Sequence, residues 1–229
     1  MSCLVHPLGV LLCYEMKINY SLYLITDKKL AGKHRLCEIV LAAIKGGVTI
    51  IQYREKNANT AQMVNEAGEI HKITKKFHIP LIINDRIDVA LAIDAEGVHV
   101  GQDDMPALLA RRLIGSEKIL GVSVRTVSQA KNAVLTGADY LGIGDIFGSA
   151  SKPDAGEPIG LETVYEITKT VAISTVGIGG ITKKNADSVI AAGADGIAVI
   201  SAITGKPDPE KEAKELRAGL KKYDQAIKK

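Results

Sequence analysis

Aromatic residues are scarce in this 229-residue chain, which has no tryptophan and only two phenylalanines. Surfaces that bind nucleic acids usually combine aromatic side chains with a basic stripe, and the net charge here is only +3. The three cysteines, Cys3, Cys13 and Cys37, are odd in number and lack the spacing of metal ligands. We therefore expect no nucleic-acid partner, no disulfide framework, and free thiols in the reducing cytoplasm.

Apolar runs long enough to cross a membrane are also missing. The stretch Leu8–Cys13 is too short to span a bilayer. A signal peptide carries a positive charge before its apolar region, and no Lys or Arg precedes this stretch. We expect no membrane partner. We interpret residues 1–15 as a disordered or non-native extension, and place the catalytic domain at residues 16–229.

Valine, isoleucine, alanine and glycine are plentiful in the rest of the chain, where short strand-like runs alternate with helical patterns. Eight such runs alternating with eight helices predict one α/β domain, a (β/α)8 barrel, with an open doubly wound sheet as the main alternative. The expected strands are 21–26, 48–52, 80–83, 97–100, 119–122, 140–143, 172–176 and 196–200. The expected helices are 36–45, 60–77, 87–93, 105–113, 127–135, 161–169, 184–192 and 210–222.

Two carboxylates follow neighbouring strands in the segment from Ile82 to Pro106. Asp85 comes directly after one strand and Asp104 shortly after the next. Because parallel strands end at the same edge, we expect the two side chains to face each other, as a Mg²⁺ site that also holds substrate phosphate would require. The alternative is that both aspartates cap helices.

Cations and glycines at other strand ends predict two phosphate sites. Arg54, Lys56 and Lys152 belong with the proposed metal and form the more strongly charged site. The second is the segment Gly177–Ile181 (GIGGI), which we expect to lead into a helix capped by Thr182, next to Ile200 and Ser201. The alternative for GIGGI is a tight turn that needs positive φ angles.

Histidine gives no sign of a catalytic role in the sequence. His99 lies inside a predicted strand and is expected to be packed or hydrogen-bonded. No Ser/His/Asp or Cys/His arrangement is predicted at this edge of the barrel, so covalent hydrolase chemistry is not expected.

Six motifs occur in an order that resembles the thiamine-phosphate synthase family. They are IQYREK (Ile51–Lys56), the segment from Ile82 to Pro106, LGVSVRT (Leu120–Thr126), SASKPDA (Ser149–Ala155), GIGGI (Gly177–Ile181) and GADGIAVISAI (Gly193–Ile203). The likeness runs from about Tyr20 to the end of the chain.

The resemblance implies a transferase of thiamine biosynthesis. The family joins 4-amino-2-methyl-5-(hydroxymethyl)pyrimidine diphosphate to a thiazole phosphate, with Mg²⁺, and releases pyrophosphate. Carried across by motif, the catalytic residues would be Lys152, Arg54 and Ser123. The pyrimidine diphosphate would be bound by Gln52, Tyr53, Arg54, Glu55, Lys56, Asn84, Ser123 and Lys152. The thiazole phosphate would be bound by Ser149, Ala150, Ser151, Gly180, Ile200 and Ser201, and Mg²⁺ by Asp85 and Asp104.

Three departures from the family pattern concern shape rather than ligands. Tyr53 replaces the usual leucine, Ser149 and Ser151 replace threonines, and GDIFG (Gly144–Gly148) replaces a commoner GPVFP. Two alternative functions are a thiazole tautomerase-like isomerase and a non-catalytic barrel that binds phosphate ligands. The isomerase uses a histidine where this chain has Arg125, which cannot exchange a proton at neutral pH. The expected partners are the two small-molecule substrates and, as a possibility, further copies of the chain.

Overall fold

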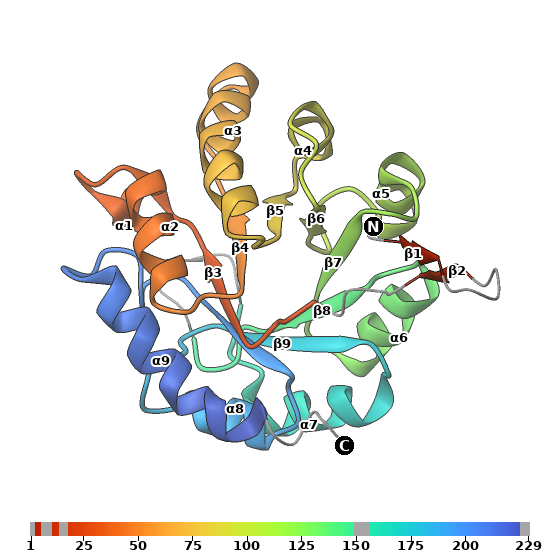
Figure 1. Ribbon diagram of the computed structural model, residues 1–229. Helices are drawn as coiled ribbons and strands as arrows, with labels where there is room; N and C mark the ends of the chain where they lie inside the picture. The colour runs from red at the N-terminus through yellow and green to blue at the C-terminus, as the bar shows by residue number, and fades with distance from the viewer. Residues whose placement is uncertain (1–2, 6–10, 14–17, 149–155, 225–229) are drawn as a thin grey trace.

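The computed structural model describes residues 3–5, 11–13, 18–148 and 156–224 of the chain. Within them, eight parallel strands close into a barrel that an outer ring of helices surrounds (Figure 1). The strand order is β10-β3-β4-β5-β6-β7-β8-β9, so the first barrel strand pairs with the last. The predicted (β/α)8 barrel is confirmed, and the open doubly wound sheet is excluded.

The barrel strands are short and almost completely buried, because side chains on both faces are covered. Their sequences are rich in β-branched residues, and each strand overlaps the run that predicted it. The strands are β3 (Leu22–Ile25), β4 (Ile50–Tyr53), β5 (Leu81–Asn84), β6 (Gly97–Val100), β7 (Ile119–Val124), β8 (Tyr140–Ile143), β9 (Ser174–Ile178) and β10 (Gly196–Val199).

Each strand is followed by at least one helix, and the predicted helices are all present. One additional helix, the four-residue α1, was not predicted, and Asp27 caps it by accepting a hydrogen bond from the amide of Leu30. The helices are α1 (Lys28–Ala31), α2 (Leu36–Lys45), α3 (Thr60–Lys76), α4 (Ile87–Ala92), α5 (Ala107–Ile114), α6 (Val127–Leu135), α7 (Gly160–Thr170), α8 (Ala186–Ala191) and α9 (Pro209–Asp224). Among the described residues, none of these helices is both long and apolar enough to span a bilayer.

Side chains that alternate along each strand build two separate apolar layers. One layer fills the space between the strands and the helices, and Ile51 and Tyr53 of β4 belong to it. The other fills the interior of the barrel and includes Tyr23, Ile82 and Tyr140. Because neighbouring residues of a strand point to opposite layers, only every second residue can reach a site inside the barrel.

A separate antiparallel pair lies in the N-terminal segment. Strand β1 (Cys3–Val5) pairs with β2 (Leu11–Cys13) as a two-stranded sheet, which adds no strand to the barrel. Nothing in the sequence pattern predicted this pairing. The interpretation of residues 1–15 as an extension outside the catalytic domain stays a prediction.

Candidate active site

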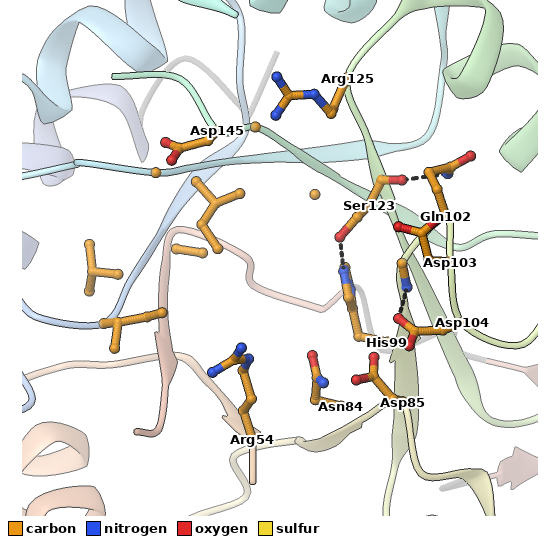
Figure 2. A pocket seen from close by; sticks show the side chains of 18 of the residues that line it. Arg54, Asn84, Asp85, His99, Gln102, Asp103, Asp104, Ser123, Arg125 and Asp145 are labelled. Carbon is orange, nitrogen blue, oxygen red and sulfur yellow. Dashed lines mark hydrogen bonds between the residues drawn. The ribbon is translucent and has the colours of Figure 1, made fainter. Parts of the chain in front are cut away.

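A cavity of about 230 Å³ opens at the carboxyl ends of the barrel strands, where (β/α)8 enzymes hold their active sites. A smaller cavity of about 20 Å³ lies deeper in the barrel, and Arg54, Asn84, His99 and Ser123 line both. Figure 2 shows the polar side chains that converge on the larger cavity from different strand ends. Those labelled in the figure are Arg54, Asn84, Asp85, His99, Gln102, Asp103, Asp104, Ser123, Arg125 and Asp145, and Lys56 also lines the cavity.

The two predicted carboxylates meet at this cavity. Asp85 and Asp104 lie within hydrogen-bonding reach of each other, and Lys56 Nζ donates to Asp85 Oδ2 at 2.5 Å. Burial, and then the neighbouring Asp104, raise the pKa of Asp85, while Lys56 opposes the rise. The alternative role as helix caps is excluded, because Arg86 and Pro106 occupy the cap positions of α4 and α5.

A divalent cation suits this pair of carboxylates chemically. Two carboxylates held close together in a partly buried site repel each other, and a bound cation reduces that repulsion. Among the described residues no group of three or more His, Cys, Asp or Glu side chains is placed to hold a metal. The protein would thus supply two oxygen ligands and leave the remainder to phosphate and water, which is how Mg²⁺ commonly binds.

Guanidinium groups stand on two sides of the cavity. Arg54 is largely buried, with 13% of its side chain exposed, and its Nη1 lies 3.9 Å from Asp27 Oδ2. Its Nε is buried and has no hydrogen-bond partner within the described part of the chain. An unpaired donor of this kind is costly unless a ligand accepts from it. Arg125 lies across the cavity and donates through Nη2 to the carbonyl of Glu157.

The GIGGI segment forms a tight glycine turn at the rim. Gly179 and Gly180 have φ angles of 106° and 62°, which confirms the turn interpretation. A Cβ on Gly179 would fall 1.7 Å from Asp145 Oδ1, so backbone and carboxylate are in close contact. The expected cap at Thr182 is wrong, since its amide donates to Asn185 Oδ1 and α8 begins only at Ala186.

A serine and a histidine are paired on the cavity floor, a contact that was not predicted from the sequence. Ser123 Oγ lies 2.8 Å from His99 Nε2. The pairing was hidden in the sequence because it depends on the register of β6 against β7, in which His99 faces Gly121. It is no Ser-His-Asp triad, since His99 Nδ1 bonds the hydroxyl of Tyr140 rather than a carboxylate. The expectation that His99 is packed and hydrogen-bonded is confirmed.

Three residues assigned to substrate are not brought into the cavity. Tyr53 points into the layer beneath the helices, where its hydroxyl donates to Glu66 Oε2 at 2.8 Å. The physical reason is strand alternation, because Gln52 takes the inward position and lines the deeper cavity. Glu55 accepts from the amide of Asn57, and Ser201 is exposed beyond the lining residues. We correct the assignment of the Tyr53 side chain accordingly, and the assignments of Glu55 and Ser201 stay predictions.

Other predicted ligands reach the cavity or lie outside the described residues. The cavity is lined by the predicted residues Arg54, Lys56, Asn84, Asp85, Asp104, Ser123, Gly180 and Ile200, and the deeper one also by Gln52. The predicted residues Ser149, Ala150, Ser151 and Lys152 fall in the segment 149–155, outside the described part of the chain.

Several lining residues were not assigned from the sequence, among them Asp145 and Tyr140. Asp145 contributes a further carboxylate, and its Oδ1 accepts from the amide of Gly148 at 3.1 Å. It lies two residues after the end of β8, so position at a strand end was an available signal. Tyr140, by contrast, is a buried residue of β8 whose sequence context gives no hint that its hydroxyl contacts His99.

Comparisons with known proteins agree on one family. Residues 22–203 match the family model described as thiamine monophosphate synthase. The thiamine-phosphate synthase of Roseiflexus sp. is 55% identical over 196 residues, covering 86% of this chain and 83% of that protein. The enzyme of the same name from Clostridium novyi is 51% identical, covering 88% and 98%. A solved structure, thiamine phosphate pyrophosphorylase from Pyrococcus furiosus, has a TM-score of 0.83 at 41% identity, covering 90% of this chain and 97% of that one.

Proposed function

The chain belongs to the thiamine monophosphate synthase family, and from that premise we propose how its cavity carries out the reaction. The protein is a transferase, a thiamine-phosphate synthase. It joins 4-amino-2-methyl-5-(hydroxymethyl)pyrimidine diphosphate to 4-methyl-5-(2-phosphooxyethyl)thiazole, and the products are thiamine phosphate and pyrophosphate.

The observation that carries the proposed mechanism is the placement of Arg54 and Lys56 around the Asp85–Asp104 pair. Both cations line the cavity, and Arg54 Nε is a buried donor without a partner in the described residues. A diphosphate seated there would accept from that donor and from the Lys56 ammonium. As the pyrophosphate leaves, its charge grows, so fixed donors stabilise the transition state more than the ground state.

We assign a Mg²⁺ ion to Asp85 and Asp104, in keeping with their contact and with the cations beside them. When bound, Mg²⁺ would neutralise part of the charge on the leaving pyrophosphate. Lys56 now pairs with Asp85, so metal binding would free its ammonium to meet the diphosphate. Asn84, on the same strand end, would orient the diphosphate through its amide.

The chemistry that we propose needs no protein nucleophile. An electron-rich aminopyrimidine supports positive charge on its methylene carbon, so the carbon–oxygen bond can break before the thiazole nitrogen attacks. The protein's tasks are to hold both substrates in line and to exclude water from the reactive carbon. The aliphatic side chains of Ile178, Ile181 and Ile200, which line the cavity, suit the second task.

The thiazole phosphate is assigned to the rim formed by Gly179, Gly180 and Ile200. Glycine at positive φ leaves the backbone open to an anion, and the cavity is lined by these residues. Ser149, Ala150, Ser151 and Lys152 are assigned to the substrates by resemblance alone. We assign Lys152 to the leaving pyrophosphate, and Ser149 and Ser151 to the thiazole phosphate.

Small molecules are the partners that the family's activity implies. A cytoplasmic location is part of the proposal, supported by the unpaired cysteine count and by phosphorylated substrates that do not cross membranes. Self-association into a homo-oligomer is also kept as a prediction.

The decisive test is a coupled assay of pyrophosphate release. Parent enzyme with both substrates and Mg²⁺ should release pyrophosphate and form thiamine phosphate in equal amounts. Omission of the thiazole, or addition of a chelator, should abolish product. Steady pyrophosphate release without the thiazole would instead indicate a hydrolase, and full activity in the chelator would remove the metal from the proposal.

A further inference from the structure

A chain of hydrogen bonds runs through the interior of the barrel and ends at Ser123. Gln52 Nε2 donates to Tyr23 Oη at 2.9 Å, and Tyr23 Oη lies 2.8 Å from Tyr140 Oη. Tyr140 Oη lies 2.9 Å from His99 Nδ1, and His99 Nε2 lies 2.8 Å from Ser123 Oγ. Five side chains from five different strands, β3, β4, β6, β7 and β8, are thereby joined in one line.

We propose that this chain is directional and holds the Ser123 hydroxyl as a hydrogen-bond donor to a ring nitrogen of the pyrimidine substrate. Tyr23, Tyr140 and His99 act through Ser123 as positioning residues, and Gln52 supplies the first donor. The inference rests on the proposed function, because the pyrimidine is the substrate of that reaction.

The proposed direction gives each proton along the line one acceptor. An amide nitrogen can only donate, so the Tyr23 oxygen accepts from Gln52. Either hydroxyl can be the donor between Tyr23 and Tyr140, and in the proposed order Tyr23 donates to Tyr140. Tyr140 in turn gives its proton to His99 Nδ1. A neutral imidazole that accepts at Nδ1 carries its proton on Nε2, which therefore donates to Ser123 Oγ. The serine's own proton is left for the cavity.

Burial keeps water from competing with these bonds. Tyr140 is 0% exposed, Tyr23 1% and Gln52 2%. Burial raises the pKa of both tyrosines above the ordinary range, so each keeps the one proton that the proposed order requires. Hydrogen bonds shielded in this way are stronger and their order is more firmly fixed than at a wet surface.

Two glycines in β7 and β8 leave room for the hydrogen-bonded side chains. A Cβ on Gly121 of β7 would lie 2.2 Å from Tyr140 Cζ and 2.4 Å from His99 Nδ1. A Cβ on Gly142 of β8 would lie 3.1 Å from His99 Cε1. Two strand glycines, each unfavourable for strand stability, are thus needed to let the histidine and tyrosine rings meet.

The position of Ser123 indicates which substrate atom accepts its hydrogen bond. Ser123 lines both cavities, whereas Lys56 and Asp85 line only the larger one, where the diphosphate is assigned. The deeper cavity combines apolar residues such as Ile25, Val176 and Ala198 with polar ones that include Gln52, Asn84 and Ser123. A heteroaromatic ring at the mouth of this cavity can meet both kinds of side chain. A ring nitrogen accepts a hydrogen bond, whereas the exocyclic amino group donates one.

The first test is the tautomer of His99, read from ¹⁵N chemical shifts of histidine-labelled parent enzyme at neutral pH. The His99 signals are assigned by comparison with a His99→Asn variant. The proposal requires a protonated Nε2 and an unprotonated Nδ1. A protonated Nδ1 would reverse every bond in the chain and overturn it.

The second test compares substrates within one variant, so the fraction of folded enzyme cancels. Tyr140→Phe removes the donor to His99 and should lower kcat/KM about tenfold with the normal pyrimidine diphosphate. With the analogue whose ring nitrogen facing Ser123 is replaced by CH, the same substitution should have almost no effect. The analogue altered at the other ring nitrogen should behave like the normal substrate. Tyr23→Phe should give the same pattern with a smaller loss.

Tyr20→Phe is the matched control. The Tyr20 ring packs on Tyr140 with centroids 4.8 Å apart, but its hydroxyl is not part of the chain. In this variant kcat/KM should change by the same factor for the normal substrate and for both analogues. An equal loss for all three with Tyr140→Phe, or no loss with the normal substrate, would overturn the inference. Inactivity of the parent enzyme would instead count against the proposed function.

Discussion

Lys56 Nζ lies 2.5 Å from Asp85 Oδ2, and the carboxylate of Asp104 stands within hydrogen-bonding reach of the same aspartate. The ammonium thus partly neutralises a pair of like charges. It is half exposed, at 50%, whereas the Asp85 side chain is only 16% exposed. Lys56 can therefore swing toward a phosphate while the carboxylate stays in place to meet a cation.

Asp85→Asn should leave the fold unchanged and remove most of the Mg²⁺-dependent activity. Asp85 has a φ of 59°, a left-handed conformation that asparagine tolerates far better than alanine does. We expect kcat/KM at saturating Mg²⁺ to fall by roughly 100-fold or more, which corresponds to about 3 kcal/mol of lost charge stabilisation. Equilibrium dialysis with Mn²⁺ measures the metal site directly.

The control for this variant is Asp88→Asn. Asp88 also lies in the β5–α4 region, but it is exposed and pairs with Arg86 rather than facing the cavity. Its loss should change neither metal binding nor turnover. Parental Mn²⁺ affinity in Asp85→Asn would remove this aspartate from the metal site.

Gly179→Ala should destabilise the protein and impair binding of the thiazole phosphate. The φ of 106° is strained for alanine, and the new Cβ would collide with Asp145 Oδ1. We expect a loss of about 1–3 kcal/mol in the free energy of unfolding, measured with urea, and a raised KM for the thiazole phosphate. Gly219→Ala in α9 is the control, since no atom lies within 4 Å of its Cβ position, and it should be neutral or slightly stabilising. Unchanged stability and KM in Gly179→Ala would show that the turn accommodates a Cβ at this position without strain.

The barrel was predictable because its signals are local and repeated. The helix 127–135 was predicted to the residue from its apolar spacing, and the strand 97–100 from a buried run between turn residues. Strand alternation could also have removed Tyr53 from the site, since Gln52 and Tyr53 are neighbours and cannot both face inward.

The parts that escaped prediction depend on contacts between distant segments. The pairing of Ser123 with His99 requires the register of two strands, and the contact of Asp145 with Gly179 requires two loops to meet. Neither has a signature in local sequence. Helix α1 was missed because a four-residue helix shows no periodicity, and depends on its cap at Asp27.

The buried tyrosines predict loss of stability at alkaline pH. Burial raises the pKa of Tyr20, Tyr23 and Tyr140 in the folded state, whereas in the unfolded state it is about 10. Between these values the folded protein holds protons that the unfolded chain has lost. Stability is therefore fully present below pH of about 10 and falls as pH rises toward the folded-state pKa. Urea unfolding measured from pH 8 to 11 should show this fall.

Tyr20→Phe should reduce the steepness of the alkaline fall, because it removes one of the groups that ionise only on unfolding. Tyr165→Phe is the control, because it removes a hydroxyl from a tyrosine that is 52% exposed on α7. An identical pH dependence in parent and Tyr20→Phe would show that other groups govern the alkaline transition.

Arg54 allows the diphosphate assignment to be tested without catalysis. Its buried Nε lacks a partner in the described part of the chain, and a bound pyrophosphate would supply one. Arg54→Gln should weaken binding of Mg²⁺–pyrophosphate by about 10- to 100-fold, the value of one charged hydrogen bond in a partly buried site. Isothermal titration calorimetry measures this affinity.

Arg54→Lys keeps the charge but loses Nε and the planar fork, so an intermediate loss of affinity is expected. Arg35→Gln, which removes an exposed cation paired with Glu69, should bind as the parent does. If Arg54→Lys also bound as the parent does, the buried Nε would not face the diphosphate. If Arg54→Gln did so too, the leaving group would have to be placed elsewhere in the cavity.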